Sequence, residues 1–433
     1  MKVVKFGGTS LASAAQIKKA VEIIQADDQR QAVVLSAPGK RDNQDTKITD
    51  LLINTHKQKT AGEEYLPTFE KIRARFVELS ELLEVDVNIA AELDVIEQKI
   101  TAGTTLDFVE SRGEYLNSLI IAKYLGAEFV DAANVVRLTI DGRVDPESYE
   151  LISKQLGNAT GRFVVPGFYG TGPDGEIKTF SRGGSDITGA IVARGVNADV
   201  YENWTDVSGI LQADPRIVPA AQSIPEITYA EVRELASCGA SVFHEEAIAP
   251  VRDAKIPINI KNTNSPADCG TMIQPTRSAE KMPVVGVSGK KPYRILNAEK
   301  FMLNRYPELP GQIKEALTQQ DLAVEFDMKG FDSFALMVDS SSNFDENAIC
   351  KYILEKTEVD ACSFGMTVAL VGIVGAGLQS QTGLLGRMLS ALDQAEIGIR
   401  SISYGGSQLT ALLAINLEDY ENTLKVLVAQ LQK

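Results

Sequence analysis

The segment KFGGTS, which begins at Lys5, combines residue types suited to holding phosphate. It follows two valines and precedes apolar residues at helical spacing, so the pattern predicts a strand that turns into a helix. The adjacent glycines Gly7 and Gly8 let the backbone approach a ligand closely, and N–H groups near a helix start attract anions. Lys5 adds a positive charge. Many turns between a strand and a helix contain two glycines, so a phosphate site and an ordinary turn both stay open at this point.

Two further polar clusters stand beside predicted strands and helices. The run from Ser36 to Lys40 follows an apolar strand and offers a hydroxyl, a flexible turn and a cation, which fits a phosphate contact or an ordinary turn equally well. The run SRGE ends at Glu114 and is expected to open an apolar helix. Because the helix dipole favours a carboxylate in the first turn, Glu114 fits either a cap or an acceptor for a substrate ammonium group.

The run SRGGSD, which ends at Asp186, indicates function more strongly. Arg182 can grip a carboxylate through two parallel hydrogen bonds, and Asp186 can hold a cation or an ammonium group. Such residues around two glycines are rarely assembled for packing alone. The loop WTDVSG, followed by Asp214 and Arg216, suits a nucleotide, although its tryptophan, Trp204, also fits a place in the core.

The composition limits the class of protein. The chain has 433 residues, 44% hydrophobic and 23% charged, which is ordinary for a globular protein of two to four domains. No run approaches the ~18 apolar residues of a membrane helix, and a net charge of −15 argues against nucleic acid. Four cysteines without paired spacing and two histidines give little basis for a metal site. We therefore expect a cytoplasmic protein with no nucleic-acid or membrane partner and no dedicated metal ligands.

The pattern of predicted elements changes once along the chain. Up to about residue 262, apolar strands alternate with helical patterns, which predicts a mostly parallel sheet covered by helices. Residues 262–283 are rich in turn formers and indicate a linker. Beyond them the order strand, helix, strand, strand, helix occurs twice, beginning with a strand expected at 300–304, and predicts two ferredoxin-like units. The second copy lacks its last strand, which the extra strand expected at 284–288 is available to supply.

Taken together and in this order, KFGGTS, SRGE, SRGGSD, WTDVSG and DPR resemble the motif set of the aspartokinases, members of the amino acid kinase family. The resemblance implies a three-layer, carbamate kinase-like α/β catalytic domain over residues 1–275, with a mostly parallel sheet. It further implies two ferredoxin-like α+β ACT units over 284–365 and 366–433, with strand 284–288 belonging to the second. By pattern alone these units fit a structural or dimerisation role as well as a regulatory one.

The resemblance also implies a reaction. ATP, accompanied by Mg²⁺, would phosphorylate the side-chain carboxylate of L-aspartate to 4-phospho-L-aspartate, the first step toward lysine, threonine and methionine. Lysine or threonine, or both, would regulate the enzyme through the ACT units. The near-absence of histidine is no obstacle, because phosphoryl transfer depends mostly on positioning and charge neutralisation, and the acceptor carboxylate is already ionised. We expect a homodimer or a dimer of dimers.

Roles carried over by the resemblance fall into four sets. The catalytic residues would be Lys5 and Asp186. The phosphate and ATP site would comprise Lys5, Gly7, Gly8, Ser36, Thr205, Asp206, Asp214 and Arg216. The substrate site would comprise Thr49, Glu114, Arg182 and Ser185. The effector candidates are Asn304, Arg305, Val324 and Glu325.

The chain departs from the family pattern at two nucleotide-side positions. Ser241 stands where many relatives carry a lysine, and Leu211 stands where several carry a tyrosine. Two alternatives to an aspartokinase follow: a sister kinase that acts on glutamate or another acyl acceptor, and a catalytically silent amino-acid sensor. The presence of Lys5, Glu114, Arg182 and Asp186 in one chain disfavours the sensor, because a silent relative is expected to lose charged site residues, whose burial destabilises a fold.

Overall fold

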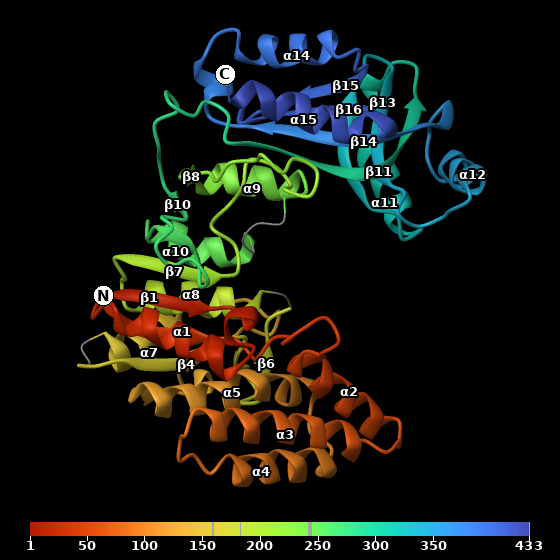
Figure 1. Ribbon diagram of the computed structural model, residues 1–433. Coiled ribbons are helices and arrows are strands. Elements are labelled where there is room, and N and C mark those ends of the chain that lie inside the picture. The colour runs from red at the N-terminus through yellow and green to blue at the C-terminus, as the bar shows by residue number, and fades with distance from the viewer. Residues whose placement is uncertain (158–159, 182, 241–244, 433) are drawn as a thin grey trace. The chain divides into compact units, whose positions relative to one another are not determined.

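The computed structural model describes residues 1–157, 160–181, 183–240 and 245–432, which form two compact units (Figure 1). The first unit comprises Met1–Ile210, Ser223–Tyr229 and Val242–Arg277. The second comprises Leu211–Gln222, Ala230–Ser241 and Ser278–Lys433. No helix in the described ranges is long and apolar enough to cross a membrane.

An eight-stranded sheet in the order β3-β4-β2-β1-β7-β9-β10-β8 forms the centre of the first unit. Every pair of neighbouring strands is parallel except β9 with β10. The strands are β1 (Lys2–Phe6), β2 (Arg30–Leu35), β3 (Glu128–Phe129), β4 (Phe163–Pro166), β7 (Val200–Thr205), β8 (Glu226–Thr228), β9 (Ile258–Asn262) and β10 (Thr271–Gln274). A separate hairpin joins β5 (Tyr169–Thr171) and β6 (Ile177–Thr179). The expectation of a mostly parallel sheet is confirmed, but β10 lies inside the stretch expected to be a linker.

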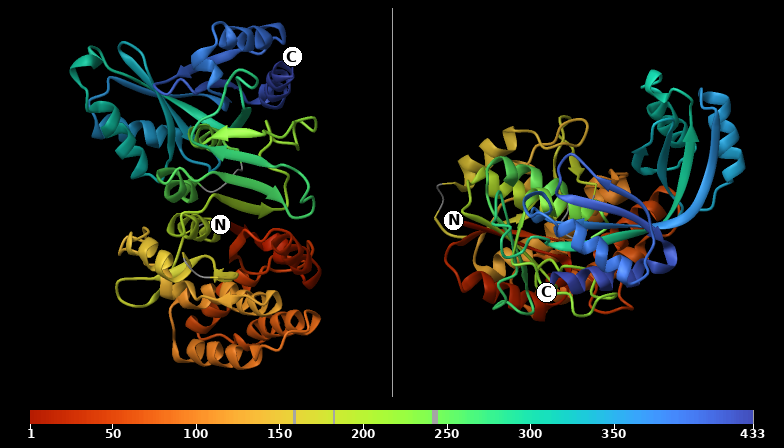
Figure 2. Two further views of the ribbon diagram at one scale, coloured as in Figure 1. Left: turned by 90° about the vertical axis from the view of Figure 1, so that its left-hand side faces the viewer. Right: turned by 90° about the horizontal axis from the view of Figure 1, so that it is seen from above.

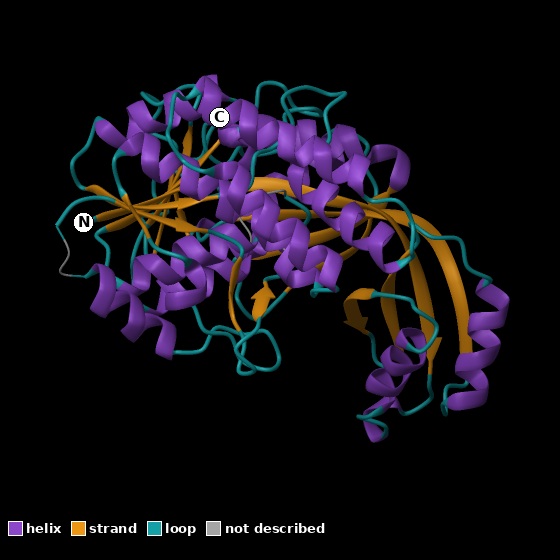
Figure 3. Ribbon diagram, turned by 90° about the horizontal axis from the view of Figure 1, so that it is seen from below, coloured by secondary structure: helices purple, strands orange, loops and turns teal. Residues whose placement is uncertain are grey.

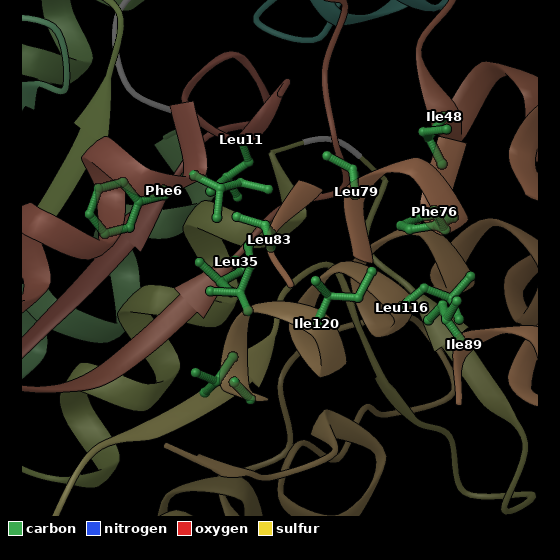
Figure 4. Packing of buried hydrophobic residues seen from close by; sticks show 14 of the residues in the cluster. Phe6, Leu11, Leu35, Ile48, Phe76, Leu79, Leu83, Ile89, Leu116 and Ile120 are labelled. Carbon is green, nitrogen blue, oxygen red and sulfur yellow. The ribbon is translucent and has the colours of Figure 1, made fainter. Parts of the chain in front are cut away.

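Helices lie on both sides of this sheet (Figure 3), which is why β4 is apolar and buried throughout and β1 is buried from Val3 to Phe6. One set packs its apolar faces into a single cluster with β1, β2 and β4; Figure 4 shows Leu35, Leu79 and Ile120 within it. These helices are α1 (Ala14–Gln25), α2 (Ile48–Thr60), α3 (Leu66–Leu82), α4 (Ile89–Ala102) and α5 (Leu106–Leu125). The shorter elements of the unit are η1 (Gly8–Leu11), α6 (Ala132–Val135), α7 (Glu147–Leu156), α8 (Gly184–Gly195), η2 (Glu245–Ala247) and α10 (Ile248–Asp253).

A six-stranded antiparallel sheet in the order β12-β13-β11-β14-β16-β15 forms the second unit (Figure 2). Its strands are β11 (Gly286–Glu299), β12 (Val324–Lys329), β13 (Ser333–Asp339), β14 (Ala361–Val374), β15 (Ile399–Tyr404) and β16 (Thr410–Asn416). Its helices are η3 (Leu303–Arg305), α11 (Leu309–Thr318), α12 (Glu346–Lys356), α13 (Gly377–Ser380), α14 (Leu384–Gln394), η4 (Leu417–Asp419) and α15 (Tyr420–Leu431). Helix α9 (Tyr229–Ser237) belongs to it from Ala230 onward.

Two hydrophobic cores divide this sheet into ferredoxin-like halves. One core contains Leu296, Ile313 and Ile353, and the other contains Val371 and Leu424. The halves share β11 and β14, each of 14 residues, because the first part of β11 pairs with the end of β14 and its second part with the start of β14.

The strand expected at residues 300–304 is absent, so that prediction is wrong. β11 ends at Glu299 and Leu303–Arg305 is a 3₁₀ helix. The first strand of the first half instead continues directly from the stretch expected at 284–288, where Val287 packs into the core of the second half. The assigned domain boundaries stay a prediction.

Two glycine substitutions test this packing. A Cβ at Gly372 in β14 would lie 2.9 Å from the Cβ of Cys238, whereas one at Gly386 in α14 would meet no atom within 4 Å. Gly372→Ala should therefore lower the free energy of unfolding of the second unit by about 1–3 kcal/mol. Gly386→Ala, the matched control, should raise it by about 0.5–1 kcal/mol. Denaturant unfolding measures both, and equal effects of the two variants would contradict the packing described.

Candidate active site

The turn after β1 is built by close contact between two backbone segments. β1 lies between β2 and β7, so its carboxyl end opens at the middle of the sheet. Gly7 N–H donates to the Trp204 carbonyl (3.0 Å), and Gly39 N–H donates to the Gly8 carbonyl (2.9 Å). A Cβ at Gly39 would lie 2.7 Å from the carbonyl carbon and oxygen of Gly8, so only glycine fits there without a shift.

A cavity of about 210 Å³ lies at this edge of the sheet, where ligands bind in open α/β folds. Its lining comes from β1, α2, α5, α8 and the loops after β2 and β4. The lining residues are Lys5, Ser36, Thr49, Glu114, Phe168, Gly183, Gly184, Ser185 and Asp186. Residues from motifs that are far apart in the sequence therefore meet in one cavity, although only Lys5 and Ser36 lie at the ends of strands of the parallel sheet.

A buried ion pair lies at the base of the cavity. Lys5 Nζ is 2.6 Å from Asp186 Oδ1, and the Lys5 side chain is 9% exposed. Asn203 lies opposite Lys5 in the strand register, and its side-chain amide donates to the same Asp186 oxygen (2.7 Å). The carboxylate thus compensates the buried ammonium and is itself held in place. The structure thus brings Lys5 and Asp186 together and adds Asn203, which the sequence analysis did not single out.

Glu114 supplies a second buried carboxyl group. It lies in the middle of α5, which begins at Leu106 after the cap Thr105, so the expectation that SRGE opens a helix is wrong. A role for Glu114 as a cap is thereby excluded. Burial raises the pKa of Glu114 to about 8, although the Ala37 backbone N–H partly offsets the rise. Its Oε2 has no hydrogen-bond partner among the described residues, so this oxygen is available to accept a hydrogen bond from a cationic ligand.

Three further residues, on α5 and in the cavity wall, lie near this group without an assigned role: Arg112 of the SRGE run, Asn117 and Phe168. The Arg112 guanidinium lies over three aromatic rings, 4.6 Å from Phe108, 4.5 Å from Tyr115 and 5.2 Å from Tyr169. One turn after Glu114, Asn117 donates to the Ser36 carbonyl (2.8 Å) and so fixes the loop after β2.

Phe168, in the cavity wall, has a φ of 81°, a conformation that few residues other than glycine adopt and that clusters at functional sites. Membership of Arg112 in the SRGE run and the polar Asn117 shortly after it were the available signals for these residues.

The remaining predicted site residues are not all in this cavity. Thr205 donates to Asp206 (3.1 Å) at the end of β7, beside β1. Asp214 and Arg216 lie in the second unit and pair with each other at 2.6 Å. Trp204 is 1% exposed, so it is a core residue.

Arg182 and Ser241 lie outside the described residues. Among the effector candidates, Glu325 pairs with Lys290 (3.2 Å) at the start of β12, beside a half-buried Val324. Asn304 and Arg305 are exposed on η3. No three His, Cys, Asp or Glu side chains gather as metal ligands within the described ranges.

Comparison with known proteins decides the family. The amino acid kinase family matches residues 1–262, and the ACT domain matches residues 371–431. Aspartokinase 3 of Bacillus subtilis is 34% identical over 99% of this chain and 98% of its own length. The chain belongs to the amino acid kinase family, among the aspartokinases. Lysine-sensitive aspartokinase 3 of Escherichia coli is a more distant relative, 27% identical over 99% of this chain and 98% of its own length.

Solved aspartokinase structures agree with this fold. The crystal structure of Clostridium acetobutylicum aspartate kinase superposes with a TM-score of 0.94 at 40% identity, covering 99% of both chains. Escherichia coli aspartokinase III in complex with aspartate and ADP superposes with a TM-score of 0.77 at 25% identity, covering all of both chains. The expected fold class, an amino acid kinase domain with a mostly parallel sheet followed by ferredoxin-like ACT units, is confirmed.

The buried carboxyl of Glu114 gives a pH-dependent prediction. Because its pKa is raised to about 8 from an ordinary 4.5, the folded protein holds a proton that the unfolded chain releases, so stability falls as pH rises between these values. Glu114→Gln should remove this loss and gain stability relative to the parent protein at about pH 8 but not below about pH 5. Unfolding free energies at the two pH values measure the effect.

Glu81→Gln, at an exposed position on α3, is the matched control and should show no such dependence. An equal pH dependence in the parent protein and in Glu114→Gln would mean that Glu114 is ionised throughout.

Proposed function

We propose that this aspartokinase transfers the γ-phosphoryl group of ATP to the side-chain carboxylate of L-aspartate, with the cavity around Lys5, Glu114 and Asp186 as the reaction site. One observation carries the assignment: a single cavity joins a buried lysine, which precedes the Gly7–Gly8 turn and is suited to phosphate, with a buried carboxyl whose Oε2 has no hydrogen-bond partner among the described residues and is suited to an ammonium group. An amino acid with a side-chain carboxylate fits this cavity, because its ammonium group can bind the buried carboxyl and its carboxylate can accept a phosphoryl group held by the lysine.

Charge neutralisation at the transferring group falls to the residues around β1. Lys5 is positioned to compensate negative charge on the phosphoryl oxygens, and the Gly7–Gly8 turn brings backbone N–H groups to the phosphates. An oxygen of the aspartate carboxylate attacks the γ-phosphorus, the bond to the bridging oxygen breaks, and ADP leaves with that electron pair. No proton moves in this step, so no histidine base is required. The Lys5–Asp186 pair holds the ammonium in place before the nucleotide arrives.

Mg²⁺ belongs to this proposal as the partner of ATP. Mg²⁺ commonly binds through phosphates, water and one or two carboxylates, and Asp186 is a carboxylate already facing the cavity. When bound, the ion supplies further neutralisation of the phosphate charge. On this proposal Asp186 meets both Lys5 and the metal-bound nucleotide, and Asn203 keeps it oriented between them.

Glu114 binds the ammonium group of aspartate in this scheme. An arriving cation lowers the pKa of a carboxyl group, so substrate binding near neutral pH releases the proton that burial keeps on Glu114. Thr49 and Ser185 offer hydroxyl groups from the cavity wall. Arg182 is assigned to a substrate carboxylate. Thr205 and Asp206 are assigned to the nucleotide, as are Asp214 and Arg216.

The second unit is assigned to regulation of the reaction. An Escherichia coli aspartokinase III structure, 25% identical with a TM-score of 0.79, holds lysine and aspartate, which makes lysine the first effector to test and threonine the second. Residues 284–365 and 366–433 are proposed as the two ACT units and residues 1–275 as the catalytic domain. The strands β12 and β15 form the two edges of the sheet, and edge strands commonly pair with another copy, in keeping with a homodimer. A cytoplasmic location remains our expectation.

Replacement of Lys5 tests the chemistry. Lys5→Met should lower kcat by about 10²- to 10³-fold, because it removes the charge at the transferring group. Lys2→Met is the matched control on the same strand, where Lys2 instead pairs with Asp27 at 2.7 Å, and should keep its activity. Trapping the acyl phosphate with hydroxylamine, in ATP and Mg²⁺, measures both variants with aspartate and with glutamate.

The same assay separates the alternatives. Product from aspartate alone supports the proposal, and product from glutamate alone would make the protein a sister kinase. No product from either acid, with lysine or threonine still bound, would make it a sensor.

Replacement of Glu325 tests the regulatory assignment. Glu325→Ala should raise the concentration of lysine or threonine needed for half-maximal inhibition while kcat stays unchanged, because Glu325 lies on the second unit. Glu355→Ala, at an exposed position on α12, is the control. Inhibition curves with each amino acid measure the shift, and identical curves for all three proteins would remove Glu325 from the effector site.

A further inference from the structure

A buried arginine on α3 contacts the segments that form the phosphate turn. The Arg75 side chain is 4% exposed. One terminal nitrogen of its guanidinium donates to the Ala12 carbonyl (2.6 Å) and to the Gly39 carbonyl (3.1 Å). The other donates to Asp45 (2.7 Å). Ala12 directly follows η1, which begins at Gly8. Arg75 therefore joins the backbone segment after β1 to the backbone segment around Gly39.

The two carbonyls belong to segments that already touch each other. Gly39 N–H donates to the Gly8 carbonyl at 2.9 Å, and there is no room between the two backbones for a side chain. Arg75 binds the far side of the same contact, through the Gly39 carbonyl. The turn is thus held between its own backbone hydrogen bond and one guanidinium group. A shift of Arg75 would therefore displace both segments.

The pair of Arg75 with Asp45 extends this support toward the substrate side. Asp45 also accepts hydrogen bonds from the Arg41 backbone N–H (2.9 Å) and Nε (3.0 Å). Burial raises the pKa of Asp45, but the bonds from Arg41 and Arg75 hold it well below its usual range, so the carboxylate stays ionised. Asp45 shortly precedes α2, where Thr49 lines the cavity. One network therefore joins the turn after β1 to the loop after β2, as far as Asp45 near the start of α2.

Packing of α3 does not account for this arginine. Phe69, Ile72, Phe76 and Leu79 already bury one face of the helix in the core. Burying an arginine is costly, and its Nε has no partner among the described residues. A planar group with donors in several directions is, however, the side chain that can reach two carbonyls and a carboxylate together.

We propose that Arg75 is a positioning residue for phosphoryl transfer, which orients the Gly7–Gly8 turn and the loop from Ser36 to Gly39 from a helix that does not line the cavity. The proposal rests on the proposed function and assigns to α3 a role in catalysis. Arg75 does not touch the substrates and acts through the carbonyls of Ala12 and Gly39.

Arg75→Lys tests the proposal, because it keeps the positive charge but removes the planar guanidinium group that bonds the two carbonyls and the carboxylate together. Arg73→Lys is the matched control: Arg73 lies on the same helix and also bonds carboxylates, Asp94 at 2.8 Å and Glu97 at 2.7 Å, both on α4. We expect Arg75→Lys to lower kcat by about 10- to 100-fold, since small displacements of reacting groups have effects of this size. The KM for L-aspartate should change little, and Arg75→Lys, at the more buried position, should lose more thermal stability than Arg73→Lys.

A second readout does not depend on turnover. ATP should raise the unfolding temperature of Arg75→Lys less than that of the parent protein or of Arg73→Lys, because the phosphate turn is displaced. If Arg75→Lys fails to fold, Asp45→Asn replaces it: this variant keeps the carbonyl bonds of Arg75 but weakens their anchor, and should show a smaller loss of kcat of the same kind.

Three outcomes would overturn the proposal: wild-type kcat in folded Arg75→Lys, an equal loss of kcat in Arg73→Lys, or, where Arg75→Lys does not fold, wild-type kcat in Asp45→Asn. Failure of the proposed function is distinguishable, because the parent protein itself would then form no hydroxamate. In that event the ATP-induced stabilisation of the same variants still decides whether Arg75 orients the phosphate turn.

Discussion

The buried ion pair of Lys5 with Asp186 is the interaction on which the rest of this site depends. A lysine placed at the centre of a parallel sheet lies among apolar strands, where an unpaired ammonium would destabilise the fold. Asp186, in the first turn of α8, compensates that charge. The side-chain amide of Asn203 donates a hydrogen bond to the Asp186 carboxylate. The Lys5–Asp186 contact that offsets the unfavourable burial of the ammonium also places this ammonium where phosphate would bind. Stability and chemistry therefore place the same requirement on this part of the molecule.

Support for the cavity comes from several directions at once. Asn117 fixes the loop after β2, Arg112 packs among aromatic rings below Glu114, and Arg75 holds the carbonyls behind the glycine turn. Each of these polar side chains bonds or stacks against groups that cannot move without disturbing the sheet or α5. Such support suits phosphoryl transfer, in which the protein mostly positions and neutralises rather than reacts.

The second unit solves a different problem. A ferredoxin-like unit with its own small core is only marginally stable. Here two such halves share β11 and β14, so the sheet is continuous while the cores remain separate. An effector bound to one half can thus alter backbone that belongs to both. Packing of residues 211–222 and 230–241 with this unit also joins it to segments that lie in the middle of the chain.

The sequence by itself determined the fold class, the order of the motifs and the family. Local signals carry these features: two adjacent glycines after an apolar strand, and strands alternating with helices. The family resemblance assigned Lys5, Ser36, Thr49, Glu114, Ser185 and Asp186 to the phosphate, substrate and catalytic sets, and in the structure all six line one cavity.

Only the tertiary structure decided what surrounds these residues. Glu114 lies within a long helix rather than at its start, and β11 continues to Glu299, beyond the short strand expected at 284–288. Asn203 and Arg75 have no local pattern, since their partners are 17 and at least 30 residues away in the sequence. Contacts between residues so far apart in the sequence arise from tertiary packing, so local sequence patterns do not predict them.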